Sequence, residues 1–159
     1  MAKGISNRLV KIPTAMQRTI YWSALALGIE GLFGVFTVHA DVPIIVAAWT
    51  GMFVKLASQA GRKMDKTTAT KVAAGIVVGV GGIASGMRLA ETWLAYTGVG
   101  TLPAMICNAG TNAVFTYMVG CAIARVFLAR DRNAPVATIV REVKKFLLMS
   151  LGHGVHRHA

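Results

Sequence analysis

Long apolar runs, separated by short polar or basic stretches, dominate the chain and predict a series of hydrophobic helices. The longest run lies between Glu91 and Arg125, where no side chain is charged. Glycine and proline at residues 98–103 divide this run, and the part from about Leu102 onward predicts the strongest helix of the chain. A helix that spans a bilayer needs about 20 predominantly apolar residues. The run is therefore long enough to predict a membrane helix.

Three further apolar segments precede this one, at residues 19–39, 43–60 and 71–91. Tyr21 and Trp22 lie near the start of the first segment, where aromatic residues commonly mark a membrane interface. Lys55 interrupts the second segment, so a short or tilted span and a re-entrant hairpin both remain open there. Asp65 or Thr67 is suited to cap the helix that follows.

A last helix is predicted after Pro135, and it is amphipathic. Apolar residues at positions 136, 139, 140, 143, 146 and 147 share one face, while Arg141, Lys144 and Lys145 lie opposite. This pattern is typical of a basic helix that lies on an anionic cytoplasmic membrane surface. Packing of the apolar face over the protein's own loops explains the pattern equally well.

The composition agrees with a membrane protein. Hydrophobic residues make up 55% of the 159 residues and charged residues only 14%, against about 25% charged in soluble domains. We expect an all-α fold, an integral membrane helical bundle with about four membrane helices plus a C-terminal basic amphipathic helix. Residues 1–18 would form a basic cytoplasmic leader, residues 19–129 the membrane helical domain, and residues 130–159 the amphipathic helix and a histidine-containing tail.

The position of the positive charge predicts the topology. The net charge of +11 would also suit a nucleic-acid-binding protein. However, every lysine and arginine except Arg88 falls in the leader, in residues 55–71 or after residue 124. Under the positive-inside rule, these regions lie in the cytoplasm. We therefore predict a multi-pass protein of the bacterial inner membrane with both termini cytoplasmic and no nucleic-acid partner.

Regularly spaced glycines predict close contacts between helices. Glycine recurs every third residue in the first segment, and the third segment holds two GxxxG pairs. Small residues at such spacings let membrane helices approach closely. The predicted helix-packing or oligomerisation residues are Gly28, Gly31, Gly34, Gly75, Gly79, Gly82, Gly86 and Gly120.

Polar residues inside the predicted spans form the second candidate site. Asn108, Asn112 and Thr116 follow one another at i+4 steps, so they share one helix face. Glu30 lies near the middle of the first span, and an ionisable residue at that depth is a functional hypothesis. A neutral Glu30 bonded to Asn108 or Asn112 would join two helices, whereas an ionisable one would serve an ion or proton path. We favour the first interpretation.

No arrangement typical of an enzyme occurs in the spans, so we predict no catalytic residues, no cofactor and no metal site. Cys107 and Cys121 lie too far apart along one helix for a disulfide and are expected to be small packing residues. The histidines at 153, 156 and 158 have no helical HxxxH spacing and are expected to lie in a solvated tail.

Two stretches resemble known bacterial families. Residues 41–45 (DVPII), followed by residues 55–57 (KLA), resemble a segment of EcsC-type proteins. Residues 98–103, with Asn108, Thr116 and Gly120, are similar to the YcjF-like hydrophobic domain, a family of unknown function that is often fused to, or encoded beside, small GTPases. The resemblance covers about residues 41–129. It implies a helical membrane module, to which a cytoplasmic GTPase could be linked only as a separate partner, and it carries over no catalytic residue.

Two functions remain open at this point. The first is a non-enzymatic membrane subunit, a scaffold that self-associates or anchors a partner, with membrane lipids around it. Its lipid-headgroup or partner contacts would be Arg62, Lys63, Lys66, Arg141, Lys144 and Lys145. The alternative is a small oligomeric ion- or proton-conducting protein that uses Glu30 and the Asn108, Asn112 and Thr116 stripe.

Overall fold

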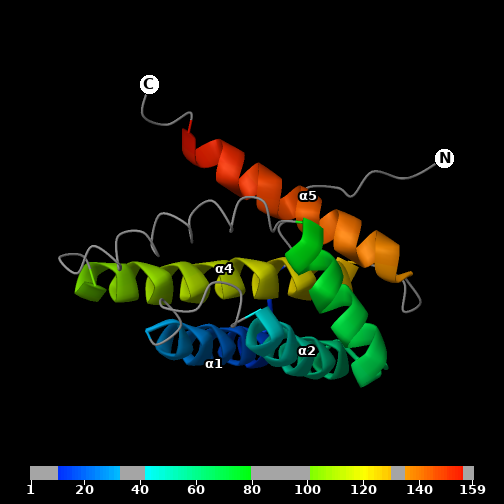
Figure 1. Cartoon of the computed structure of the whole chain (residues 1–159). Helices are drawn as coiled ribbons and strands as arrows, with labels where there is room; N and C mark the ends of the chain where they lie inside the picture. Colours follow the sequence, from blue (N-terminus) through cyan, green and yellow to red (C-terminus); the bar gives the residue numbers. More distant parts are fainter. Residues whose placement is uncertain (1–10, 33–41, 80–100, 130–134, 156–159) are drawn as a thin grey trace.

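Every regular element in the described part of the chain is an α-helix. The structure, a computed structural model, describes residues 11–32, 42–79, 101–129 and 135–155 (Figure 1). Its helices are α1 (Thr14–Gly31), α2 (Val42–Gln59), a helix over residues 66–79, α4 (Thr101–Ala129) and α5 (Val136–Val155). The prediction of an all-α helical bundle is confirmed at this level.

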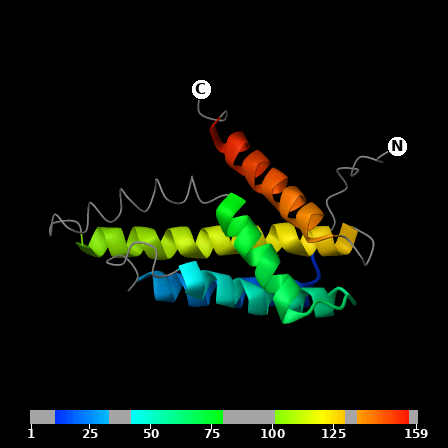
Figure 2. The ribbon, with the colours of Figure 1, turned by 45° about the vertical axis from the view of Figure 1, so that its right-hand side comes forward.

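The longest helix, α4, forms the centre of the bundle. In both ribbon views α1 and α2 lie along one side of α4, and α5 crosses it on the other side (Figures 1 and 2). The helix of residues 66–79, green in Figure 1, runs from the end of α2 towards α5. These helices enclose one main core, whose largest fully buried side chains include Met16, Ile20, Trp49, Phe53, Leu56, Val72, Ile76, Val119, Ile123, Val143 and Leu147.

Proline sets the start of α1. Pro13 lies just before Thr14 in an extended conformation, and its carbonyl accepts a hydrogen bond from the Gln17 backbone amide at 3.0 Å. The Gln17 side chain also donates to the carbonyl of Ile12 at 2.8 Å. The helix therefore begins inside the stretch predicted as a basic leader, and Arg18 belongs to α1.

A tight turn joins α2 to the helix of residues 66–79. Gly61 has a φ of 68°, and the amides of Gly61 and Arg62 donate to the carbonyls of Ser58 and Ala57. This is a Schellman C-cap, which places a left-handed residue just after the helix. Asp65 then caps the next helix by accepting a bond from the Thr68 amide at 3.1 Å, as the sequence predicted.

The Asp65 cap is an exposed carboxylate that remains ionised in the folded protein. Its pKa is held below the usual 3.8, first by the Thr68 side-chain hydrogen bond and then by the Thr68 backbone bond. Because both bonds favour the charged form, the cap stabilises the fold at pH values above the usual pKa of an aspartate. Its contribution is lost only as the pH falls through the lowered pKa.

Two helices in the described residues are long and apolar enough to cross a membrane. They are Val42–Gln59 and Leu102–Ala129, and they meet this criterion by length and composition alone, as the buried core helix of a soluble protein also can. The first helix, α1, carries Arg18 and Glu30 and is not among them. The predicted spans 19–39 and 71–91 continue into residues 33–41 and 80–91, which lie outside the described part.

The apolar face of α5 packs inside the bundle. Ile139, Val143 and Leu147 belong to the main core, with Val136, Val140 and Phe146 partly buried against it. Arg141, Lys144 and Lys145 are exposed. Of the two sequence interpretations, packing against the protein itself therefore holds, although the partners are helices rather than loops. In this arrangement the apolar face of α5 is not available to lie in a membrane surface.

Candidate functional site

The polar stripe of α4 lies at the interface with α1 and α2. Asn108, Asn112 and Thr116 are each no more than 6% exposed, and Gly120 is also buried. The i+4 spacing places them on one face of α4, and this face is turned towards the neighbouring helices rather than outward. The structure thus brings together the three polar residues that the sequence singled out.

Two glycines of α1 allow its backbone to approach α4 closely at this stripe. A Cβ atom added to Gly31 would lie 3.0 Å from the Ala109 Cα and 3.1 Å from the Asn108 carbonyl oxygen. One added to Gly28 would lie 3.1 Å from the Ala113 Cβ. At the other end of the stripe, a Cβ on Gly120 would lie 2.7 Å from Ile20 Cγ2. Larger residues would therefore force α1 and α4 apart.

Two hydrogen bonds of the stripe join α4 to its neighbours. Asn108 Nδ2 donates to the Gly31 carbonyl at 2.6 Å, which satisfies an acceptor at the C-terminal end of α1. The Trp49 indole N–H on α2 donates to the Thr116 hydroxyl at 3.1 Å. Both bonds are buried, and such hydrogen bonds contribute about 0.5–1.5 kcal/mol each to stability.

Glu30 lies beside this interface. It is half-buried on α1 and directly precedes Gly31, whose carbonyl Asn108 contacts. The bond that Asn108 donates goes to the backbone at Gly31. The Asn108 amide therefore joins α4 to α1, while the predicted bond between Glu30 and Asn108 or Asn112 stays a prediction.

Gly75 and Gly79 face α5 of the same chain. A Cβ on Gly75 would lie 3.1 Å from a methyl group of Val140, and one on Gly79 would lie 3.6 Å from the Lys144 Cδ. This GxxxG pair therefore packs against a helix of the same chain. The predicted residues Gly34, Gly82 and Gly86 lie outside the described part.

Among the predicted surface cations, Arg62 differs from expectation. Lys63, Lys66, Arg141, Lys144 and Lys145 are all exposed. Arg62 is only 9% exposed, and its guanidinium lies over the Phe127 ring at 5.5 Å. A cation held against an aromatic face stabilises the packing of α2 against α4. Arg62 thus packs against α4 in this structure, and its predicted headgroup or partner contact stays a prediction.

The structure also reveals pairs that the sequence did not indicate. Gln59 on α2 donates to the Thr19 hydroxyl on α1 at 3.1 Å. Thr50 on α2 donates to the Thr70 hydroxyl at 3.2 Å. These residues lack a distinctive motif, because such pairs depend on the register between helices. Cys107 departs from its prediction too, since it is exposed on α4 rather than packed, while Cys121 is half-buried.

Gly31→Ala is expected to destabilise the bundle by about 1–3 kcal/mol, because the added methyl group meets backbone atoms that cannot move independently. Gly110→Ala is the matched control, since no atom lies within 4 Å of a Cβ there. In the middle of a helix that change should be neutral or stabilising by up to about 1 kcal/mol. Denaturant unfolding in mixed micelles, followed by circular dichroism, measures both. Equal effects at the two positions would contradict the close contact of α1 with α4.

No protein-family model matches the chain, and neither a curated protein nor a solved structure is significantly similar.

Proposed function

We propose that the protein is a non-enzymatic integral membrane subunit that anchors a partner or a second copy of itself. The observation that carries this proposal is the large apolar side chains on the outside of the bundle. Trp22 on α1 is 60% exposed, and Val114 on α4 is 61% exposed. The others on these two helices are Tyr21, Leu25, Ile29, Leu102, Ile106 and Tyr117.

Lipid is the solvent that suits these faces. Exposed apolar residues are normal on soluble proteins when they are scattered singly, but continuous apolar faces indicate contact with a membrane or another protein. Along α4 the exposed residues Leu102, Ile106 and Val114 recur on one face. Only 33% of the α2 window is buried within the bundle, so part of this apolar helix also faces outward.

The distribution of charge supports a cytoplasmic end of the bundle. The bond between Thr19 and Gln59 puts the start of α1 beside the end of α2. Gly120 packs on Ile20, so the C-terminal part of α4 lies at the same end. Lys11, Arg18, Lys63, Lys66 and Arg125 belong to these segments. The positive-inside rule then favours a cytoplasmic position for this end, as in the four-span arrangement that we propose.

Fractionation and topology reporters test the proposal. We expect the protein to remain in the membrane pellet after an alkaline carbonate wash. Reporters of cytoplasmic location fused to either terminus should both be active. The N-terminal residues precede the basic start of α1, and α5 follows the basic end of α4, which the positive-inside rule places in the cytoplasm. Release by carbonate would contradict the membrane location. Reporters on opposite sides would contradict the four-span arrangement but not the membrane location.

Partner binding would use surfaces that the fold leaves exposed. Gly28, Gly31, Gly75 and Gly79 face helices of the same chain, so a second copy would instead contact the outer faces of α1 and α4. The exposed lysines of α5 suit an acidic cytoplasmic partner, and the family resemblance favours a GTPase. Affinity purification in mild detergent distinguishes a defined homo-oligomer from a complex with another protein.

A further inference from the structure

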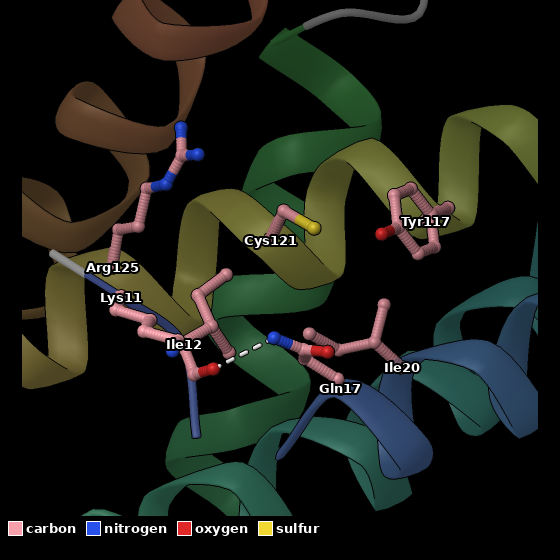
Figure 3. A pocket seen from close by; sticks show the side chains of 7 residues that line it. All are labelled: Lys11, Ile12, Gln17, Ile20, Tyr117, Cys121 and Arg125. Carbon is pink, nitrogen blue, oxygen red and sulfur yellow. Dashed lines mark hydrogen bonds between the residues drawn. The ribbon is translucent and has the colours of Figure 1, made fainter. Parts of the chain in front are cut away.

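A pocket of about 430 Å³ lies between the start of α1 and the C-terminal half of α4 (Figure 3). Two cations, a phenol and apolar side chains line it. The lining residues are Lys11, Ile12, Gln17, Ile20, Tyr117, Cys121 and Arg125. None of them was singled out as a site residue by the sequence patterns. In the close view Lys11 and Arg125 lie on one side of the pocket and Tyr117 on the other, with Cys121 between them.

The positive charge of this pocket is not balanced by its own lining, which contains no carboxylate. The Arg125 guanidinium lies over the Phe146 ring of α5, 4.8 Å from its centre. Its Nε is buried and has no hydrogen-bond acceptor in the described part of the chain. A buried, charged donor without an acceptor is destabilising. An anion in the pocket would offset the unbalanced charge of Lys11 and Arg125.

The apolar part of the pocket continues onto the outer face of α4. Ile20 is fully buried in the pocket wall, while Tyr117 is exposed at its edge. Val114 is one turn before Tyr117 and is also exposed. A ligand with a charged head and apolar chains could therefore place its head near the two cations and its chains along α4. Basic pockets between membrane helices at the cytoplasmic side are suited to anionic lipid headgroups.

We propose that this pocket binds the phosphate group of an anionic ligand, with the headgroup of an anionic phospholipid as the source that a membrane location favours. Lys11 and Arg125 would supply the charge-assisted contacts, and the Tyr117 hydroxyl a neutral donor. The choice of a lipid rests on the proposed membrane function. The affinity for phosphate rests on the pocket itself.

Protection of Cys121 from alkylation tests the site. Replacing Cys107 by serine leaves Cys121 as the sole thiol. This protein is placed in nanodiscs of phosphatidylcholine alone or mixed with phosphatidylglycerol, and its reaction with a maleimide is timed. We expect phosphatidylglycerol to slow alkylation and native mass spectrometry to retain bound phosphatidylglycerol. Lys11→Gln with Arg125→Gln should weaken this binding about tenfold or more, since charged contacts are lost.

Lys144→Gln with Lys145→Gln is the matched control, because it removes the same charge from exposed positions of α5 and should leave protection unchanged. Lys11→Gln alone keeps the contact between Arg125 and Phe146, so it still reports on binding if the double variant fails to fold. Equal alkylation in both lipids would overturn the assignment to a phospholipid headgroup, and equal loss in the control would overturn the site itself.

Inorganic phosphate added to phosphatidylcholine nanodiscs separates the two sources of the ligand. Protection by phosphate without protection by phosphatidylglycerol would support the anion site and assign it to a free phosphate compound. If neither phosphate nor phosphatidylglycerol protects Cys121, the proposed binding site is refuted. A carbonate wash of the same protein tests the membrane function separately, so a membrane-embedded protein without protection would refute only the pocket.

Discussion

Val114→Arg should reduce membrane insertion of the protein by about 2.5–3.5 kcal/mol in apparent free energy, the penalty for arginine at the centre of a membrane helix. Val114 lies near the middle of α4, and its side chain is 61% exposed on the outside of the bundle. In the proposed membrane location this position faces hydrocarbon. The measurement is the fraction of protein that resists carbonate extraction, or the glycosylation pattern in a translocation assay.

Leu148→Arg provides the comparison, because Leu148 is an exposed apolar residue on α5, outside the proposed spans. It should insert like the unaltered protein. On a water-soluble protein, both substitutions would lie on a hydrated surface and each would change stability by only about 0.5 kcal/mol. Equal, near-neutral outcomes would therefore remove the main support for a membrane subunit.

Local features of the chain were readable from the sequence because each depends on neighbouring residues. Pro13 lacks an amide proton and fixes its φ, which explains why α1 begins just after it, although residues 1–18 were predicted as a leader. Asp65 can bond the exposed amides at a helix start. The stripe of Asn108, Asn112 and Thr116 follows from the helical repeat, and its burial agrees with the view that polar residues in an apolar helix face its partners.

Contacts between helices were not readable in the same way. Periodicity shows which face of a helix is apolar, but not which helix covers that face. The spacing of Gly75 and Gly79 therefore predicts close packing, but it does not predict that Val140 of α5 is the residue that packs against Gly75. Arg62 looked like part of a solvated basic turn, and only the position of Phe127 on α4 explains its burial.

The same reason explains why the pocket was missed. Lys11 and Arg125 are far apart in the sequence, and each lies among other basic residues that look like topology signals. The antiparallel packing of α1 on α4 brings them to one cavity. The register of that packing depends on small residues such as Gly28 and Gly31, which fix how closely and where the two backbones meet.

Trp49→Ala should be the most destabilising single substitution in the bundle, by about 3–5 kcal/mol, because it removes a large buried ring and leaves a cavity. Trp49 is 1% exposed, and its ring centre lies 5.9 Å from that of Phe115 on α4. Trp22→Ala is the control, since the Trp22 ring is 60% exposed on α1. Denaturant unfolding in mixed micelles compares them, and equal losses would contradict a core centred on α2 and α4.

A double-mutant cycle separates the indole hydrogen bond from this packing. Trp49→Phe keeps an aromatic ring but removes the donor to Thr116, while Thr116→Val removes the acceptor at similar volume. Their coupling energy should be about 0.6–1.7 kcal/mol, the range for hydrogen bonds between membrane helices. Additive effects would show that the bond contributes nothing. The polar stripe would then stabilise the bundle chiefly through the close approach that Gly28 and Gly31 allow.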